Sequence, residues 1–368
     1  MKKILVVGQT PPPYGGQAVM IESMLKFSFQ RVKLYHARMD FSEGMDEIGK
    51  FKFAKIVKLL YLIGRIYFLR FRHGISTLYY PPAPPNTIPV VRDIIILNAT
   101  RWLFKSTIFH FHAAGVSELY AKFSGILKKL YEWAYFYPDV CIRLSEFNPE
   151  DGKIFRTGRE YIVPNGLPDA GAAYLEMENK PSKQDAPIKL LYVGLLCETK
   201  GVLVLLESMH YLVQAGHPFV LQLVGRFESV GFQQRVEQFI VQKNLGPYVE
   251  LLGVRTGEEK HKTFAHADIF CYPTFFEAET FGLVALEAMQ FGLPVVATRW
   301  RGVPSVVVDQ VSGFIVPPQD ANAFADKLAL LIEDESTRKL MGKKGREIYC
   351  QKFTAQRHFA LLEVAFTN

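Results

Sequence analysis

The sequence predicts an α/β protein with two doubly wound domains, each a parallel sheet covered by helices. Short apolar runs alternate with longer segments of helical period along the chain, which is typical of parallel sheets with crossover helices. The length of 368 residues exceeds the usual domain size of about 100–200 residues. A polar stretch with two prolines, residues 177–187, separates two such alternating halves. These three observations together predict two Rossmann-like domains joined by a linker.

The first half, residues 1–176, is expected to contain five strands with helices between them. Apolar runs bounded by turn residues predict strands at residues 4–7, 78–80, 108–112, 140–144 and 161–163. Apolar side chains recurring every three or four residues predict helices near residues 18–28, 50–72, 90–104, 117–136 and 148–155.

The second half begins again with a strand and predicts a domain over residues 188–345. Its strands are expected at residues 188–193, 219–224, 249–252, 269–272, 294–297 and 314–316. Its helices are expected at residues 201–214, 231–243, 258–266, 282–291 and 321–333, followed by a helical stretch over 338–366. We expect the last part, residues 346–368, to pack back towards the first domain. Two facing domains of this kind would hold a ligand in a cleft beyond the carboxyl ends of their strands.

Composition narrows the class of protein. Hydrophobic residues make up 49% and charged residues 21% of the chain, which fits a globular protein and excludes a disordered one. No apolar run approaches the roughly 20 residues that span a bilayer. The N-terminal apolar run is too short for a signal-peptide core. The four cysteines show no paired spacing, which argues against structural zinc or a disulfide framework and suits a reducing cytoplasm.

The net charge of +7 is concentrated in one segment. Residues 48–117 hold ten basic side chains and one acid, Asp93, whereas residues 185–368 have a net charge of −2. No nucleic-acid recognition module accompanies this excess, so we expect no nucleic-acid partner.

A cationic stripe follows one predicted helix inside this segment, residues 50–73. Lys58, Arg65 and Arg72 recur every seven residues, one turn after Lys55. They lie beside aromatic and leucine side chains, namely Phe51, Tyr61, Leu62, Phe68 and Leu69. Such a helix suits the surface of an anionic membrane. The alternative is a core helix whose solvent-facing side is basic.

The most informative motif is the run Tyr272–Ala288, YPTFFEAETFGLVALEA. A strand ends at its start, a loop follows, and a helix begins near Gly282. The first backbone amides of that helix, those of Phe281, Gly282 and Leu283, would favour a phosphate. Glu279 in the loop and Glu287 in the helix could each accept hydrogen bonds from hydroxyl groups. The arrangement suits a sugar on one side of a diphosphate and a ribose on the other.

A second motif, from Gly194 to Gly201, follows a strand and opens a helix. Lys200 at the start of that helix could neutralise a diphosphate leaving group. The alternative for Lys200 is a solvated surface lysine without a ligand.

Two features of the first half also suggest a site. Gly15 and Gly16 come between the first strand and its helix, but without the GxGxxG spacing of a dinucleotide-binding dehydrogenase. They fit either a ligand-approaching loop or a simple turn. His110 and His112 end a strand on one face, yet no third ligand has suitable spacing, so we expect no metal site. His110 is expected to be a core residue.

The second-half motif resembles the Glu-x7-Glu signature of retaining, nucleotide-sugar-dependent glycosyltransferases of the GT-B fold. The resemblance is strongest to family 4, the glycosyl transferases group 1. The residues that match in order are Pro273, Thr274, Glu279, Phe281, Gly282, Glu287, Ala288, Met289, Gly292, Pro294 and Val295. The resemblance implies a GT-B fold, with two Rossmann-like domains facing a cleft.

The resemblance also implies roles for individual residues. It makes Glu279, His112 and Lys200 the catalytic candidates, with Glu279 and His112 touching the donor sugar. It assigns Glu287 to the ribose. The remaining donor-binding candidates are Gly15, Gly16, Gly194, Val254, Phe281, Gly282 and Leu283.

One position departs from the family pattern. Leu195 stands where the family has an arginine that clamps the diphosphate, and Arg226 is expected to serve as a substitute. This departure supports one alternative function, a non-catalytic GT-B accessory subunit. A GT-B phosphorylase or epimerase is the other alternative.

The expected function is therefore the retaining transfer of a hexose from a nucleotide diphosphate sugar to a hydroxyl acceptor. The acceptor is expected to be a lipid-linked or cell-surface polysaccharide precursor. The resemblance implies no cofactor and no metal. We expect a cytoplasmic enzyme, peripheral on the inner face of the plasma membrane.

Overall fold

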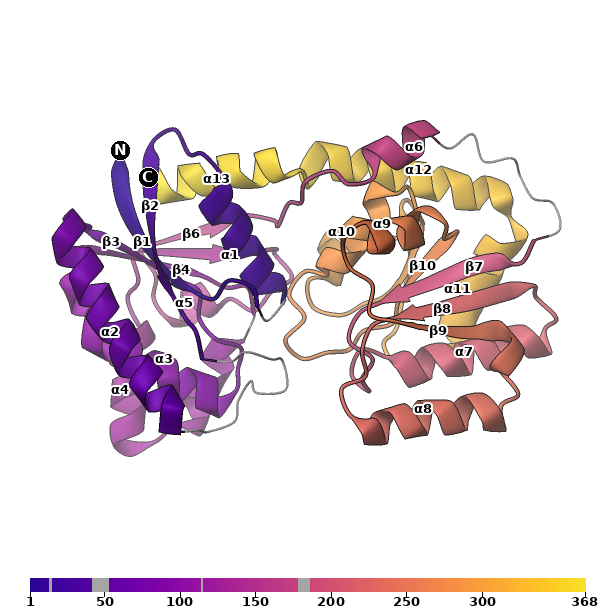
Figure 1. Ribbon diagram of the computed structural model, residues 1–368, viewed down its shortest axis with the longest axis horizontal. Helices are drawn as coiled ribbons and strands as arrows, with labels where there is room; N and C mark the ends of the chain where they lie inside the picture. Colours follow the sequence, from indigo (N-terminus) through magenta and orange to yellow (C-terminus); the bar gives the residue numbers. More distant parts are fainter. Residues whose placement is uncertain (13–14, 42–52, 114, 178–185) are drawn as a thin grey trace. The chain divides into compact units, whose positions relative to one another are not determined.

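The computed structural model describes residues 1–12, 15–41, 53–113, 115–177 and 186–368. The chain falls into two compact units (Figure 1). The first comprises Met1–Asn165 together with Gln356–Asn368, and the second comprises Gly166–Ala355. The boundary thus lies at Asn165, earlier than the expected residue 176. Most of the expected linker, residues 178–185, lies outside the described residues.

The first unit contains a six-stranded sheet in the order β2-β1-β3-β4-β5-β6, in which every pairing is parallel. The strands are β1 (Lys2–Gly8), β2 (Val32–Arg38), β3 (Thr77–Tyr80), β4 (Ser106–His110), β5 (Val140–Arg143) and β6 (Arg159–Ile162). Strand β2 was not expected from the sequence. It is an edge strand that is buried mainly at Val32 and Ala37, so its residues form no continuous apolar run.

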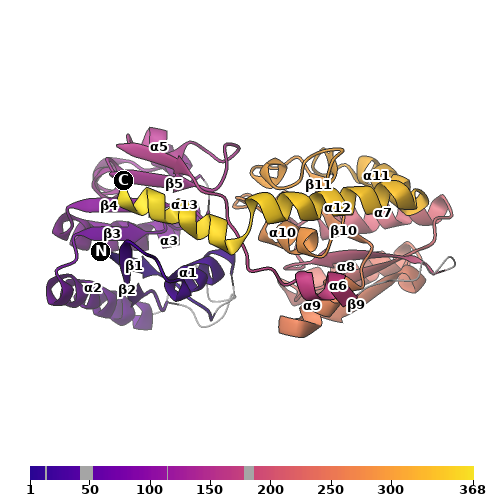
Figure 2. The ribbon, with the colours of Figure 1, turned by 90° about the horizontal axis from the view of Figure 1, so that it is seen from above.

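Helices cover both faces of this sheet (Figures 1 and 2). They are α1 (Gly16–Lys26), α2 (Phe53–His73), α3 (Thr87–Thr100), α4 (Gly125–Tyr135), α5 (Asp151–Ile154) and α13 (Ala355–Thr367), with 3-10 turns η2 (Arg101–Leu103) and η3 (Val116–Lys122). Because side chains alternate along a strand, Tyr80 joins the core formed with α2, α3 and α4. Its neighbour Tyr79 faces the other way and meets Phe366 of α13, with ring centroids 5.7 Å apart.

The second unit repeats this architecture with the strand order β12-β11-β10-β7-β8-β9, again all parallel. Its strands are β7 (Ile188–Val193), β8 (Phe219–Val224), β9 (Val249–Gly253), β10 (Ile269–Tyr272), β11 (Val295–Thr298) and β12 (Gly313–Val316). Its helices are α6 (Ala172–Met177), α7 (Val202–Gln214), α8 (Val230–Gln242), α9 (Gly257–Ala265), α10 (Leu283–Gln290), α11 (Ala321–Glu333) and α12 (Glu335–Lys352), with 3-10 turns η4 (Gly246–Tyr248) and η5 (Val303–Ser305). Leu190, Leu205 and Leu328 represent the core that these elements share.

The expected helix over residues 338–366 is two helices, α12 and α13. The break falls at Phe353 and Thr354, where Leu167 lies alongside the chain. The Leu167 amide donates to the Phe353 carbonyl at 3.0 Å, and the Ala355 amide donates to the Leu167 carbonyl at 3.0 Å. These bonds replace helical ones, so α12 ends in the second unit and α13 belongs to the first. Figure 2 shows α13 lying over the sheet of the first unit.

Candidate active site

The turn between β7 and α7 brings Lys200 to the start of a helix. Gly201 adopts a left-handed conformation, with φ of +78°. A Cβ atom at Gly201 would lie 2.1 Å from the carbonyl oxygen of Pro273, so only glycine fits there. The turn therefore packs directly against the loop that follows β10.

That loop ends in a second glycine with left-handed backbone, Gly282, at the start of α10 (φ +89°). A Cβ atom there would lie 2.9 Å from a ring carbon of Tyr272. The tight turn leaves the first amides of α10 without partners inside the helix, as at any helix N-terminus. Phe281 contributes only its backbone, because its side chain is buried and packs on Phe353, with ring centroids 5.7 Å apart.

The two loops bring Lys200 and Glu279 together in an ion pair. Their side chains are largely covered, with exposed fractions of 21% and 12%. The Phe275 amide donates to the Thr199 carbonyl at 2.8 Å, which fixes one loop against the other. The ammonium of Lys200 also lies 4.7 Å from the ring centroid of Phe276. The sequence indicated both residues but not their pairing.

Two buried phenols, those of Tyr272 and Tyr192, interact electrostatically with Glu279. Burial raises the pKa of Tyr272 well above its ordinary value, and the charge of Glu279 and a hydrogen bond to it act in the same direction. Tyr192, whose pKa burial also raises, donates from its hydroxyl to the Leu195 carbonyl at 2.8 Å. Both phenols therefore stay neutral donors, and one of them orients the Glu279 carboxylate.

Arg226 lies next to the turn where the family's arginine would stand. The amide of Leu196 donates to the Arg226 carbonyl at 2.9 Å, and the two segments form a short parallel bridge. The Arg226 side chain is exposed and forms no ion pair within the part of the chain that the structure describes. Gly194 belongs to the same turn, and its carbonyl would lie 1.8 Å from a Cβ atom at Gly225.

Glu287 is held by a lysine that the sequence did not single out. Lys260 of α9 donates to the Glu287 carboxylate at 2.6 Å. Three basic side chains occur close together in α9, Lys260, His261 and Lys262, so spacing alone could not identify the partner. Val254 lies just beyond β9 and is 60% exposed. The expected contact of Val254 with the donor stays a prediction.

In the first unit, Gly15 precedes α1 with an extended backbone and no side-chain cap. Among the described residues, a Cβ atom at Gly15 would meet nothing within 4 Å. The two residues before Gly15, Pro13 and Tyr14, lie outside the described residues.

His112 lies just after β4 in a cluster with Tyr79, His110 and His358. The ring centroids of His110 and His112 are 4.0 Å apart, and the Tyr79 hydroxyl lies 2.8 Å from Nδ1 of His110 and 3.3 Å from Nε2 of His112. Burial lowers the pKa of His112 to about 3 and that of His358 to about 4, with the neighbouring His358 lowering that of His112 further. All three imidazoles are therefore neutral near pH 7.

His110 is a core residue, as expected, with 1% of its surface exposed. His358, from α13, was not expected in this cluster because it is far from His112 in the sequence. Among the described residues, no group of three or more His, Cys, Asp or Glu side chains could hold a metal ion. The predicted contact of His112 with a donor sugar stays a prediction.

A family model matches most of the second unit. Residues 175–348 match the family described as Glycosyl transferases group 1. The colanic acid biosynthesis glycosyltransferase WcaL of Salmonella typhimurium is 27% identical over 278 residues, which cover 68% of this chain and 67% of WcaL. The capsular polysaccharide biosynthesis glycosyltransferase CapM of Staphylococcus aureus is 31% identical over 165 residues, which cover 45% of this chain and 42% of CapM.

Solved structures share the fold over the full chain. Sucrose-phosphate synthase from Thermosynechococcus elongatus has a TM-score of 0.73 at 18% identity. The match covers 99% of this chain and 98% of the synthase chain. Anabaena HepE in complex with UDP has a TM-score of 0.73 at 17% identity, with each chain fully covered. The chain therefore shares the fold of these structures, GT-B, and residues 175–348, which lie within its second unit, match the family Glycosyl transferases group 1.

Proposed function

We propose that the protein is a retaining glycosyltransferase that moves a hexose from a nucleotide diphosphate sugar to a hydroxyl group of a polysaccharide precursor. The observation that carries this proposal is the Lys200–Glu279 ion pair, held where α7 and α10 begin. WcaL is named for the biosynthesis of colanic acid and CapM for that of a capsular polysaccharide, which supports the class of acceptor. HepE was solved with UDP and with UDP-glucose, which supports the class of donor.

The ion pair suits a site that exchanges partners. An incoming diphosphate would compete for the Lys200 ammonium and would also meet the open amides at Gly282 and Leu283. The Glu279 carboxylate, released from Lys200 but still oriented by Tyr272, could then accept a hydrogen bond from a sugar hydroxyl. Donor binding would thereby place the sugar next to the leaving group.

The transfer step itself needs charge stabilisation and positioning. The bond from the anomeric carbon to the phosphate oxygen breaks, and a bond to the acceptor oxygen forms on the same face. The acceptor proton passes to the departing phosphate oxygen, and a nucleoside diphosphate leaves. Lys200 and the amides of α10 face the charge that develops on that oxygen, which is the interaction expected to lower the barrier. We propose on this ground that the reaction requires no divalent metal.

The nucleoside end is proposed to lie at Glu287. Its carboxylate would accept hydrogen bonds from the ribose hydroxyls, while the ion pair with Lys260 orients it. Val254, exposed at the end of β9, would lie against the base.

A binding screen followed by a turnover assay tests the proposal. Thermal shifts with UDP-, GDP- and ADP-sugars would identify the donor, because a ligand that binds the folded state stabilises it according to its affinity. Release of nucleoside diphosphate should then depend on a saccharide acceptor. Donor binding without turnover on any acceptor would indicate an accessory subunit. Donor conversion without acceptor would indicate an epimerase, and a requirement for inorganic phosphate would indicate a phosphorylase.

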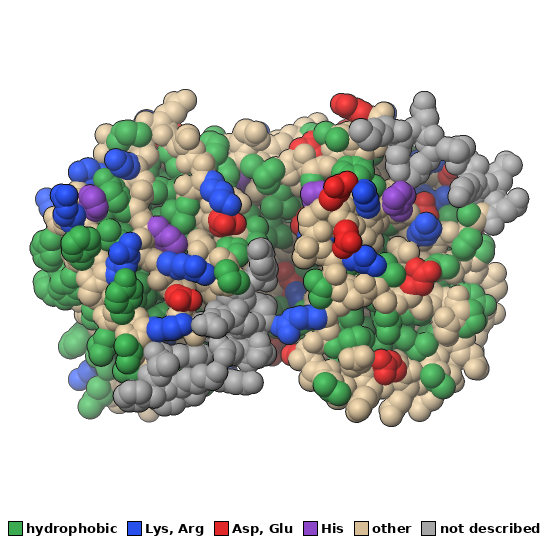
Figure 3. Space-filling model, in the orientation of Figure 1, with side chains coloured by type: hydrophobic (Ala, Val, Ile, Leu, Met, Phe, Trp, Pro, Cys, Tyr) green, Lys and Arg blue, Asp and Glu red, His purple; other side chains and the backbone are tan. Residues whose placement is uncertain are grey.

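We also propose that α2 places the protein on an anionic membrane, where a lipid-linked acceptor would be found. One face of α2 is buried in the core, and it includes Leu62 and Leu69, which the sequence analysis placed beside the cationic stripe. The other face exposes apolar and basic side chains, namely Val57, Leu60, Tyr61, Arg65, Phe68, Phe71 and Arg72. Figure 3 shows basic and hydrophobic side chains interleaved on the surface of the first unit.

The charge around α2 supports this surface. Asp93, the single acid of residues 48–117, is fully buried and pairs with Arg92 at 2.7 Å, so it does not offset the exposed cations. Lys58 is 37% exposed and lies 3.7 Å from the Asp40 carboxylate, which leaves Arg65 and Arg72 as the main cations of this face. None of the described helices is long and apolar enough to cross a membrane.

A further inference from the structure

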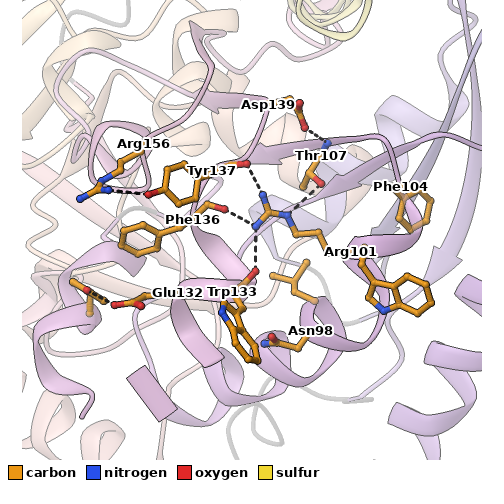
Figure 4. Close-up of a pocket in the computed structure, with 13 residues that line it drawn as sticks. Asn98, Arg101, Phe104, Thr107, Glu132, Trp133, Phe136, Tyr137, Asp139 and Arg156 are labelled. Atoms are coloured by element: carbon orange, nitrogen blue, oxygen red, sulfur yellow. Dashed lines mark hydrogen bonds between the residues drawn. The ribbon is translucent and has the colours of Figure 1, made fainter. Parts of the chain in front are cut away.

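A pocket lies in the first unit, at the end of β4 opposite to the end that leads to His112. It has a volume of about 860 Å³, within the usual range of ligand pockets. Thr107 near the start of β4 and Asp139 just before β5 line it, so it opens at the amino ends of these strands. Figure 4 shows side chains from α3, η2 and α4 around it.

The centre of this pocket is fixed by Arg101. Its guanidinium donates to the carbonyls of Ala134, Phe136 and Tyr137 at 2.7–2.9 Å, where α4 ends. These carbonyls each accept a hydrogen bond from Arg101, which holds the end of α4 against η2. Arg101 therefore builds the wall of the pocket and is not expected to bind a ligand itself.

Large aromatic side chains stand at the rim. Trp102 is 70% exposed, Trp133 is 71% exposed and Tyr137 is 63% exposed. The indole of Trp102 is oriented by a hydrogen bond from Nε1 to the Ala99 carbonyl at 3.0 Å. Exposed, oriented aromatic faces beside a cavity are suited to pack against the C–H faces of a sugar ring.

Two residues of the rim also have a left-handed backbone conformation, which residues other than glycine rarely adopt. Tyr137 and Arg156 both have φ of +55°. The Arg156 guanidinium donates to the Tyr137 hydroxyl at 2.8 Å, so the two left-handed positions hold each other in place. Such conformations persist where the surrounding structure requires them, and they occur often at ligand sites.

The polar side chains of the pocket are oriented but only partly used. One oxygen of Asp139 accepts from the Thr107 amide at 2.7 Å, and one oxygen of Glu132 accepts from the Tyr120 hydroxyl. The amide nitrogen of Asn98 donates to two main-chain carbonyls, which leaves its oxygen as an acceptor. Each of these side chains therefore keeps an acceptor for a hydroxyl donor.

The charges favour a neutral ligand. The carboxylates of Glu132 and Asp139 balance the two guanidinium groups, and the guanidinium of Arg101 already donates to main-chain carbonyls. A phosphate or an anionic headgroup would meet these carboxylates, which would disfavour it. An uncharged ligand with many hydroxyl groups matches both the aromatic rim and the free acceptors.

We propose that this pocket is a second, non-catalytic saccharide site, which binds an uncharged stretch of an oligosaccharide. Its presence in the same chain as a proposed polysaccharide-forming site makes a distant part of the acceptor or product the natural occupant, and this identification rests on the proposed function. Binding there would hold a long acceptor on the enzyme between transfers and leave short acceptors unaffected.

The test is direct binding of neutral oligosaccharides of four to six hexose units, measured by titration calorimetry in the absence of nucleotide sugar. Wild-type protein should bind at least one of a panel of gluco-, galacto- and manno-oligosaccharides. Trp133→Ala and Trp102→Ala should each weaken that binding by about three- to tenfold, the effect of losing one aromatic contact. Trp133→Phe should retain most of the affinity. Failure of the whole panel to bind, or equal binding by wild type and both alanine variants, would overturn the proposal.

Two controls separate this site from the other proposals. Phe68→Ala, a change at a similarly exposed aromatic residue of α2, should leave oligosaccharide binding unchanged. Lys200→Ala should abolish turnover but leave oligosaccharide binding unchanged. Failure of the proposed function would therefore not be mistaken for failure of this site. Vesicles of phosphatidylglycerol provide the last arm. If Trp133→Ala weakens binding to vesicles but not to oligosaccharides, the pocket is part of a membrane surface and the saccharide site is rejected.

Discussion

The two units carry charge in different ways. In the second unit, the acidic candidates each have a basic partner: Glu279 pairs with Lys200 and Glu287 with Lys260. In the first unit, the single acid of residues 48–117 is buried, while Arg65 and Arg72 are exposed and the histidines near β4 are neutral. The comparison suggests that the second unit recognises a ligand by exchanging paired charges, whereas the first unit presents excess charge to a surface.

The largest expected effect tests the paired charges at their centre. Glu279→Gln removes the carboxylate but keeps the size of the side chain, and it should lower kcat by about 10²–10³-fold, as for loss of a group that acts on the transition state. Initial rates of nucleoside diphosphate release at saturating donor would measure this. Glu277→Gln, an exposed carboxylate in the same loop, is the matched control and should be nearly silent. Full activity in Glu279→Gln would remove Glu279 from the mechanism.

The second pair should respond in affinity more than in rate. Glu287→Ala should weaken nucleoside diphosphate binding by about tenfold or more, because a charge-assisted hydrogen bond to the ribose contributes about 1.5–3 kcal/mol. Lys260→Ala should have a smaller effect in the same direction, since Lys260 only orients Glu287. Calorimetric titration with the free nucleotide would measure both. Unchanged affinity in Glu287→Ala would show that the ribose lies elsewhere.

The exposed charge of the first unit should respond to membrane composition. Replacing Arg65 and Arg72 together by Gln should weaken binding to phosphatidylglycerol vesicles by about tenfold or more, because each cation near such a surface contributes about 1 kcal/mol. Lys262→Gln with Lys339→Gln removes the same charge from exposed positions of the second unit and is the control. Equal vesicle binding by the two double variants would reject α2 as the docking surface.

The smallest effect concerns pH. The folded-state pKa values of His112 and His358 lie below the unfolded value of about 6.5, so the unfolded chain binds protons first as the pH falls. The stability that these two histidines contribute should therefore be complete above pH 6.5 and should decline from there to about pH 4 for His358 and about pH 3 for His112. Hydrogen exchange should show this loss in α13 more than in α12. A His358→Gln variant that declines as steeply as wild type would contradict the role given to that histidine.

Much of the architecture could be predicted because buried parallel strands are apolar along their whole length. Strand β2 was not predicted because it lies at the sheet edge and is only partly buried. The break between α12 and α13 was also not predicted, since it depends on Leu167, a residue far away in sequence. Local patterns do not contain such contacts.

The residues of the candidate site that belong to sequence motifs could be predicted. The contacts that depend on tertiary packing could not. Glu279 and Lys200 could be named from their places after strands, but their pairing follows from the packing of two loops. Lys260 and His358 carry no local signal, because one is among several basic residues of a helix and the other belongs to a helix at the far end of the chain. The aromatic pocket combines residues from four separate segments and could not be read from any of them.

The place of α13 has a consequence for how the protein is made. Phe359 and Phe366 of this helix pack against Phe27, Phe29 and Tyr79 in the first unit. On the ribosome, the whole second unit is synthesised before these side chains emerge, so the first unit cannot complete its core when its own sheet has been translated. The domain that begins first is therefore expected to finish last, in contrast to the usual N-to-C order of domain folding.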